Sequence, residues 1–242
     1  MIQDPRKLQL FKSSVPLCKL NGDGHPCSAA SGALVELNGK RMLLTVEHAT
    51  GDSGDWAIQI AYVPGNGTKV HRLGGMNFLA RSDLQSGKIK TVDFAYVEVP
   101  TTVAPLKQQI NDSLKIIDAI PVEVLQLRFP CPPNINEKYG FSGLIKGTVE
   151  KHPHAIVFAS ERQTYDGLKY TGTRDGDVVV FTMPESHPGD VEFRGCSGSP
   201  IIDANGTLIA LLTGGCESKN EIYGVSIESY RAVLELFSSG AI

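Results

Sequence analysis

Short runs of apolar and β-branched residues recur along most of the chain, with turn residues between them. Residues 33–37 (ALVEL) and 42–46 (MLLTV) flank an Asn-Gly pair, which is a strong signal of a β-hairpin. Further runs of this kind occupy 56–63, 94–99, 154–159, 177–183, 200–203, 207–213 and 222–227. Because many short strands follow one another at short intervals, the pattern predicts a barrel or a sandwich rather than alternating strands and helices.

Two segments depart from the strand pattern. Residues 101–121 are polar and carry proline near both ends, which is typical of a connection between two halves. Near the C-terminus, apolar residues recur at helical spacing from Ile227 to Phe237 and predict a helix. Ser226 is placed to cap its start and Gly240 to end it.

Composition excludes several classes of function. A net charge of −3 over 242 residues gives no general attraction to nucleic acid or to anionic membranes. No stretch is long and apolar enough to span a bilayer, and the N-terminus lacks the pattern of a secretory signal. The chain has the size of one large domain or two small packed ones.

The five cysteines are odd in number and form no CxxC pair, so we expect free thiols and a reducing compartment, the cytoplasm. Cys18, His25 and Cys27 are the nearest approach to a zinc site, but their spacing is unusual, and free thiols are the favoured interpretation. We therefore expect no metal and no cofactor.

The candidate for chemistry is Ser197, in the stretch FRGCSGSP at 193–200. A serine hydroxyl is a weak nucleophile unless a base lies within hydrogen-bonding reach and a third group orients that base. His48 directly follows a strand, which gives an imidazole a rigid support, although a structural histidine is the alternative. Asp93 opens the apolar run 94–99, where an acid is costly unless paired; a turn residue is the alternative.

Taken together, TVEHA, VDFAYVEV and GCSGSP occur in the order His, Asp, Ser and resemble the TAAHC, DIALLKL and GDSGGP segments of the chymotrypsin/trypsin family of serine proteases. The resemblance spans roughly residues 29–237. The rival G-x-S-x-G pattern of other serine hydrolases fails, because Ser199 stands where its second glycine belongs.

The resemblance implies an all-β fold of two six-stranded antiparallel β-barrels with a C-terminal helix. The first barrel is expected over 12–105 with His48 and Asp93, and the second over 122–226 with Ser197. The linker is expected at 106–121 and the helix at 227–239. The site then lies in the cleft between the barrels.

The resemblance also implies a mechanism. Ser197 attacks the scissile carbonyl, His48 moves the proton, Asp93 orients His48, and the N–H groups of Gly195 and Ser197 form the oxyanion hole. The expected function is a non-secreted, bacterial-type serine endopeptidase that acts on proteins or peptides and is regulated by a protein partner. Two alternatives are a catalytically silent, peptide-binding or sensor module with this fold and an esterase or acyl transferase on the same residues.

Three residue changes separate the chain from zymogen-activated relatives. Cys196 replaces the aspartate that pairs with a newly cut N-terminus, so activation by N-terminal cleavage is not implied. Ala30 and Ala49 replace the disulfide beside the histidine, in keeping with a reducing compartment. Glu47 replaces a small residue before His48, and nothing in the sequence explains it.

The specificity pocket differs from that of trypsin. By alignment on Ser197, Val191 falls at the pocket base, Glu192 follows it, and Arg194 lies near the mouth. The segment Thr213, Gly214, Gly215 matches the family's strand that binds the substrate backbone. A valine base favours an apolar or mid-sized side chain, whereas an inward-turned Glu192 favours Lys or Arg, and the sequence leaves this choice open.

Overall fold

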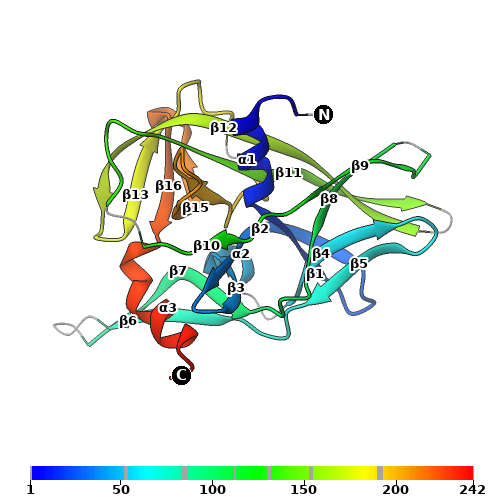
Figure 1. The fold of residues 1–242 in the computed structure, drawn as a ribbon, viewed down its shortest axis with the longest axis horizontal. Coiled ribbons are helices and arrows are strands. Elements are labelled where there is room, and N and C mark those ends of the chain that lie inside the picture. The colour runs from blue at the N-terminus through cyan, green and yellow to red at the C-terminus, as the bar shows by residue number, and fades with distance from the viewer. Residues whose placement is uncertain are drawn as a thin grey trace.

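The computed structural model describes residues 2–51, 54–82, 87–111, 113–129, 132–152, 155–189 and 193–241, without the side chains of 146–160. All nine predicted strand runs fall in strands. In chain order the elements (Figure 1) are α1 (Pro5–Ser13), β1 (Val15–Leu20), β2 (Pro26–Leu37), β3 (Lys40–Thr45), α2 (Glu47–Thr50), β4 (Asp55–Val63), β5 (Gly67–Arg72), β6 (Asn77–Ser82), β7 (Ile89–Glu98), β8 (Leu106–Ile110), β9 (Ile116–Pro121), β10 (Leu125–Gln126), β11 (Lys138–His152), β12 (Ala155–Arg174), β13 (Val178–Thr182), β14 (Pro200–Ile202), β15 (Leu208–Cys216), the 3-10 helix η1 (Glu217–Lys219), β16 (Glu221–Ser226), the 3-10 helix η2 (Glu228–Tyr230) and α3 (Arg231–Ser238).

The second half of the chain closes into the predicted six-stranded antiparallel barrel. Its strand order is β11-β12-β13-β16-β15-β14. One cluster of buried side chains fills the interior, with Tyr139, Phe141 and Phe181 among its largest members. Figure 1 shows β13, β15 and β16 side by side at one end of this barrel, while β11 and β12 continue toward the other end of the molecule.

The first half differs from the predicted six-stranded barrel. It forms an eight-stranded sheet in the order β5-β4-β1-β2-β3-β7-β6, with β10 added in parallel to β2. Among the described residues no ladder joins the two outer strands, β5 and β6. Both are polar and mostly exposed or half-buried, so they carry little apolar pattern and escaped prediction. The hairpin between β2 and β3 is as predicted: Asn38 and Gly39 take the positive φ values, 52° and 78°, of a two-residue turn.

The segment predicted as a linker, 106–121, contains a hairpin of its own, β8 and β9. Lys107 on β8 is buried, and its ammonium donates to the carbonyl oxygen of Phe11 and, at 2.8 Å, to Ser14 Oγ. Burial lowers the pKa of Lys107 well below its usual value. This contact fixes the β8–β9 hairpin to the C-terminal end of α1. The helix α1 itself was not predicted, although Asp4 and Pro5 are typical helix-start residues.

One hydrophobic cluster contains residues of both halves. Leu44 and Phe94 of the first half pack in the same cluster as Leu211 and Val225 of the second. The ring of Phe94 stacks on that of Tyr230 at a centroid distance of 4.9 Å. Because Phe94 directly follows Asp93, this contact positions the carboxylate at the junction between the halves.

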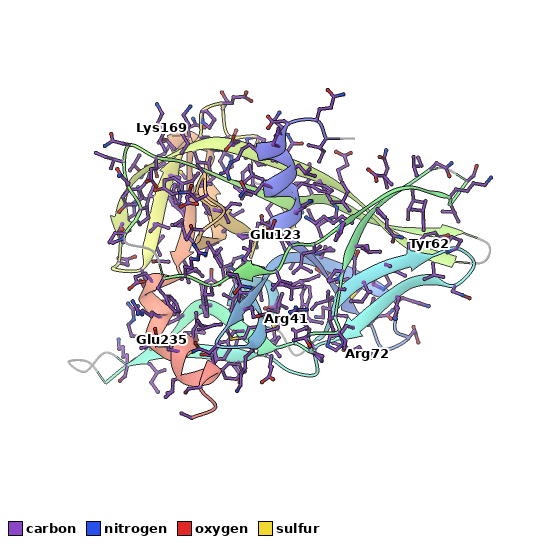
Figure 2. All side chains as sticks on the ribbon, in the orientation of Figure 1. Arg41, Tyr62, Arg72, Glu123, Lys169 and Glu235 are labelled. Atoms are coloured by element: carbon purple, nitrogen blue, oxygen red, sulfur yellow. The ribbon has the colours of Figure 1, made fainter. Side chains whose placement is uncertain are left out.

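Arg41, labelled in Figure 2, joins the first sheet to the start of the connecting segment. Its guanidinium donates to the carbonyl oxygens of Thr101 at 2.7 Å and Val103 at 3.3 Å. It also lies 3.7 Å from the carboxylate of Glu36. The connection therefore leaves the first half along a fixed path.

The C-terminal helix is shorter than predicted and has two parts, η2 and α3. Ser226 does not cap it: this residue ends β16, and no side-chain cap bond forms at either helix start. Gly240 does end the helix, with φ 76° and an N–H that donates to Phe237 O at 3.1 Å.

In the part of the chain that the structure covers, no helix has the length and apolar character needed to cross a membrane. Cys18, Cys27, Cys196 and Cys216 are free thiols, as predicted. Cys131 lies outside the described residues.

Candidate active site

His48 lies in α2, one turn of helix that follows β3 directly. Its main-chain N–H donates to Asp93 Oδ1 at 2.9 Å, and its ring Nδ1 lies 2.8 Å from Asp93 Oδ2. One carboxylate therefore holds both the backbone and the ring of His48. With Nδ1 donating to the carboxylate, the other ring nitrogen, Nε2, is left as the basic atom.

Ser197 completes the arrangement. Its Oγ lies 3.0 Å from His48 Nε2, within hydrogen-bonding distance. The structure thus brings together all three side chains singled out in the sequence, although 45 positions separate His48 from Asp93 and 149 separate it from Ser197. The His48 side chain is 44% exposed and that of Asp93 is 34% exposed, so the site is open to solvent.

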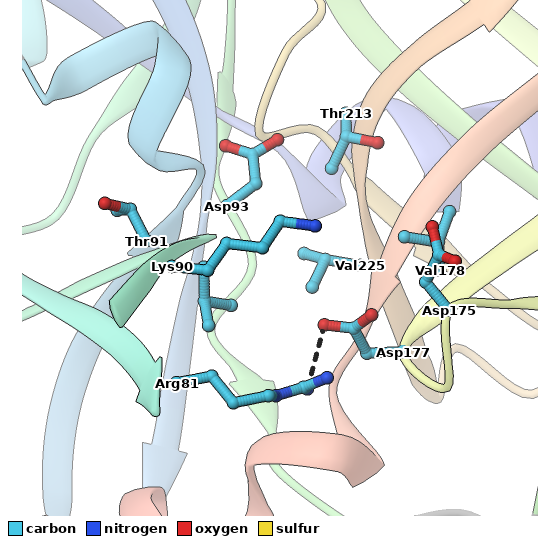
Figure 3. Close-up of a pocket in the computed structure, with 10 residues that line it drawn as sticks. Arg81, Lys90, Thr91, Asp93, Asp175, Asp177, Val178, Thr213 and Val225 are labelled. Carbon is cyan, nitrogen blue, oxygen red and sulfur yellow. Dashed lines mark hydrogen bonds and ion pairs between the residues drawn. The ribbon is translucent and has the colours of Figure 1, made fainter. Parts of the chain in front are cut away.

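Asp93 also forms part of the wall of a pocket of about 170 Å³ between the two halves (Figure 3). Lys90 and Arg81 line it from the first half, and Thr213 lines it from the second. Arg81 reaches across and pairs with Asp177 at 3.1 Å. The arginine side chain is 52% exposed, so the contribution of this pair to stability is small, but the pair joins the two halves in the wall of the pocket that Asp93 also lines.

The turn before Ser197 is closed by a backbone hydrogen bond. The N–H of Cys196 donates to Phe193 O at 3.0 Å, which closes a four-residue turn. Its third residue, Gly195, has φ 97°, the conformation that a type II turn requires there. Within the described residues, neither the Gly195 N–H nor the Ser197 N–H donates a hydrogen bond.

Ser31 on β2 supports this turn from the first half, a role that was not predicted from the sequence. Its Oγ donates to Gly195 O at 2.8 Å, and its N–H donates to Ser197 O at 3.0 Å. Thr45 Oγ1 in turn donates to the carbonyl oxygen of Ser31 at 2.8 Å. Nothing in the local sequence around Ser31 indicates this role, because Gly195 and Ser197 lie more than 160 positions away.

Cys196 is fully buried beneath the turn. Its thiol donates to Leu144 O at 3.4 Å. Burial raises the pKa of Cys196 to about 12, so the group remains a neutral thiol at physiological pH. It behaves as a small apolar residue that fills the space under the turn.

The residues predicted for the specificity pocket are only partly described. Val191 and Glu192 lie outside the described residues. Arg194 is exposed on the turn. Thr213 and the glycine pair Gly214 and Gly215 form the end of β15, next to the turn that carries Ser197.

The environment of His48 raises its pKa above the ordinary value of 6.5. The largest cause is the hydrogen bond to Asp93; burial opposes it, and the charges of Asp93 and Glu47 add to it. Glu47, which the sequence left unexplained, thus adds a small increase to the pKa of His48.

A pH dependence follows from this shift. If His48 acts as a base it must be neutral, so kcat/KM should rise with pH through a midpoint above 6.5. Asp93→Asn weakens the interaction that contributes most to the raised pKa of His48, so the midpoint should move to lower pH, with a rate loss of about 10⁴-fold. Glu47→Gln should move it slightly in the same direction without that loss. An unshifted midpoint in Asp93→Asn would contradict this assignment.

The sequence matches no protein-family model and no curated protein. The fold, however, is similar to that of solved structures. A serine endoprotease from Yersinia pestis has a TM-score of 0.58 and 12% identity, over 100% of this chain and 69% of that one. A protein called GrC has a TM-score of 0.59 and 11% identity, over 96% of each chain. Human heparin binding protein has a TM-score of 0.57 and 13% identity, over 96% of this chain and 92% of that one. The chain therefore has the chymotrypsin-like serine protease fold.

Proposed function

We propose that the protein is a serine endopeptidase that cleaves peptide bonds through Ser197, His48 and Asp93. The observation that carries the proposal is the continuous hydrogen-bonded path from Asp93 Oδ2 through His48 to Ser197 Oγ, with distances of 2.8 Å and 3.0 Å. Both distances suit proton transfer to a base that a carboxylate orients.

In the first step, Ser197 Oγ attacks the scissile carbonyl carbon while its proton passes to His48 Nε2. The imidazolium that forms is stabilised by Asp93, which stays ionised. The proton then goes to the leaving amine, and the C–N bond breaks to leave an acyl-enzyme. Water, activated by the same nitrogen, hydrolyses the ester and restores Ser197.

The negative oxygen of each tetrahedral intermediate is expected between the N–H groups of Gly195 and Ser197. The positive φ of Gly195 supports this role because it turns the N–H toward that position. One such donor contributes about 3–4 kcal/mol of transition-state stabilisation. The end of β15 at Thr213–Gly215 is suited to pair with the substrate backbone as an added strand.

The ordered turn also bears on the two alternatives. A silent peptide-binding module needs neither the His48–Ser197 hydrogen bond nor a glycine at positive φ before the serine, yet both are present. An esterase or acyl transferase would use the same groups, but the half-buried glycine pair of β15 favours an extended peptide. Endopeptidase activity is therefore the function that the geometry supports best.

The intact chain should be active without trimming of its N-terminus. Cys196 is a neutral, buried thiol and has no charge to pair with a new amine. Ser31 holds the turn instead, through its bond to Gly195 O. A protein partner remains our proposal for regulation.

The proposed function is tested by incubating the full chain, verified as intact by mass spectrometry, with a mixed peptide library at neutral pH. Internal cleavage of peptides, absent in Ser197→Ala, is expected. Hydrolysis of simple esters without peptide cleavage would favour an esterase. Activity that appears only after N-terminal trimming would contradict the role given to Ser31.

A further inference from the structure

One buried histidine beside the active site has no role in the proposed chemistry. His187 is 6% exposed, and its ring stacks on that of Phe193 with centroids 4.6 Å apart and planes 12° apart. Its Nε2 lies against the backbone of Gly215, where an added Cβ would be 2.5 Å away. A single imidazole therefore contacts both the turn that leads to Ser197 and the end of β15.

A backbone hydrogen bond determines which nitrogen of the neutral ring carries the proton. The N–H of Gly189 donates to His187 Nδ1 at 3.0 Å. Since Nδ1 accepts, the proton of the neutral imidazole resides on Nε2. That atom is buried and has no acceptor within the described residues. Buried donors without a partner are rare in native proteins, and such an atom calls for a ligand that accepts its hydrogen bond.

The location of the ring identifies that ligand. Gly198 N–H donates to Leu212 O at 2.8 Å, and Leu212 N–H donates to Ser199 O at 2.9 Å, so β15 passes directly beside Ser197. In the endopeptidase proposed above, a peptide paired with Thr213–Gly215 and attacked by Ser197 would direct one side chain toward β15 and the turn at 193–195. This side chain belongs to the residue that supplies the attacked carbonyl, called here the P1 residue.

We propose that His187 selects the P1 residue of the substrate by donating a hydrogen bond from Nε2 to an oxygen at the end of its side chain. Gln and Glu carry such an oxygen, whereas Lys and Arg offer donors only, and apolar side chains leave Nε2 unpaired. The proposal rests on the proposed endopeptidase function, because it names the substrate of the same site. It also goes beyond the choice between an apolar and a basic P1 residue that the sequence left open.

The Gly215 backbone covers Nε2 in the structure, so the proposal requires the end of β15 to move when a substrate binds. Neither Gly214 nor Gly215 has a side chain that would oppose this movement. A Cβ at Gly214 would have no neighbour within 4 Å. The register of β15 on β16 also shifts between Leu212 and Gly214, so the pairing is irregular at this point.

The test compares substrates that differ only at P1, with Gln, Glu, Met or Lys in one peptide sequence. Met is close to Gln in length but lacks the strong acceptor, so the ratio of kcat/KM for Gln to that for Met isolates the hydrogen bond. The wild type should favour Gln or Glu over Met by about 10- to 100-fold, the range expected for one buried donor that gains its acceptor. His187→Phe, which keeps an aromatic ring beside Phe193, should bring this ratio close to one by removing the donor that Gln and Glu peptides use.

His25→Phe is the matched control, because His25 is exposed on a turn and should leave the ratio unchanged. A wild-type preference for Lys or Met, or a ratio that survives His187→Phe, would overturn the proposal.

A second measurement does not depend on catalysis. Ser197→Ala protein is titrated with peptides whose C-terminal residue is Gln, Glu, Met or Lys, and the ¹⁵N resonance of His187 Nε2 is followed. A shift of that resonance with Gln or Glu peptides alone is expected. Such binding without any cleavage by the wild type would refute the endopeptidase function and retain the recognition role. Cleavage without a P1 preference and without the shift would refute the recognition role alone.

Discussion

Replacement of Ser197 by Ala should lower peptide hydrolysis by about 10⁶-fold, because it removes the hydroxyl that lies 3.0 Å from His48 Nε2. His48→Ala should have an effect of similar size, since Oγ then has no base at 3.0 Å. The double variant should be no worse than either single one, because the two groups act as a unit. Steady-state kinetics on one peptide substrate, with all three variants, measures this.

Folding should survive both substitutions, because the two side chains are at least partly exposed in the cleft. Thermal unfolding of each variant is the control for this point. Ser199→Ala is the matched variant for the serine: its Oγ is buried two residues away and has no hydrogen-bond partner in the described part of the chain. It should retain most of the activity. If Ser197→Ala is as active as the wild type, Ser197 is not the nucleophile.

Gly198→Ala should cause the largest loss of stability of any single methyl group added near the site. Gly198 has φ 86°, and an added Cβ would lie 2.1 Å from Ser31 O and 2.4 Å from Thr45 Oγ1. Backbone strain of about 1–3 kcal/mol and a packing clash of about 1–3 kcal/mol combine here. The melting temperature should fall by roughly 10 °C. Activity should fall as well, because Ser31 moves and carries the turn with it.

Gly22→Ala is the matched control for this variant. A Cβ at Gly22 would meet nothing within 4 Å, and Gly22 has no positive φ. The substitution should change the free energy of unfolding by no more than about 0.5 kcal/mol. Wild-type stability and activity in Gly198→Ala would contradict the close packing of Ser31 and Thr45 against the serine loop.

The elements that the sequence predicted correctly have strong local signals. The β2–β3 hairpin has an Asn-Gly turn between two apolar runs, and the second barrel has several strands that are buried for most of their length. The three candidate residues, His48, Asp93 and Ser197, each adjoin such an element. The order His, Asp, Ser along the chain indicated a protease-like site because each of the three residues lies next to a strand that the sequence predicted.

The features that were missed depend on contacts between distant segments. β5 and β6 are mostly polar, and β10 joins the first sheet through only two residues, so none of them has a clear apolar pattern. Ser31 and His187 look ordinary in the sequence. Their importance comes from partners such as Gly195 and Gly215, which the fold places beside them. The predicted cap at Ser226 failed because the last strand extends to that residue.

Covalent labelling with a fluorophosphonate tests the central claim most directly, because this probe is small, carries no peptide and reacts with an activated serine. The intact chain is labelled at neutral pH and then digested, and the modified residue is located by mass spectrometry. A single adduct on Ser197, lost in His48→Ala, is the expected result. No adduct, or an equal adduct on Ser197 when His48 is replaced, would show that His48 does not activate this hydroxyl.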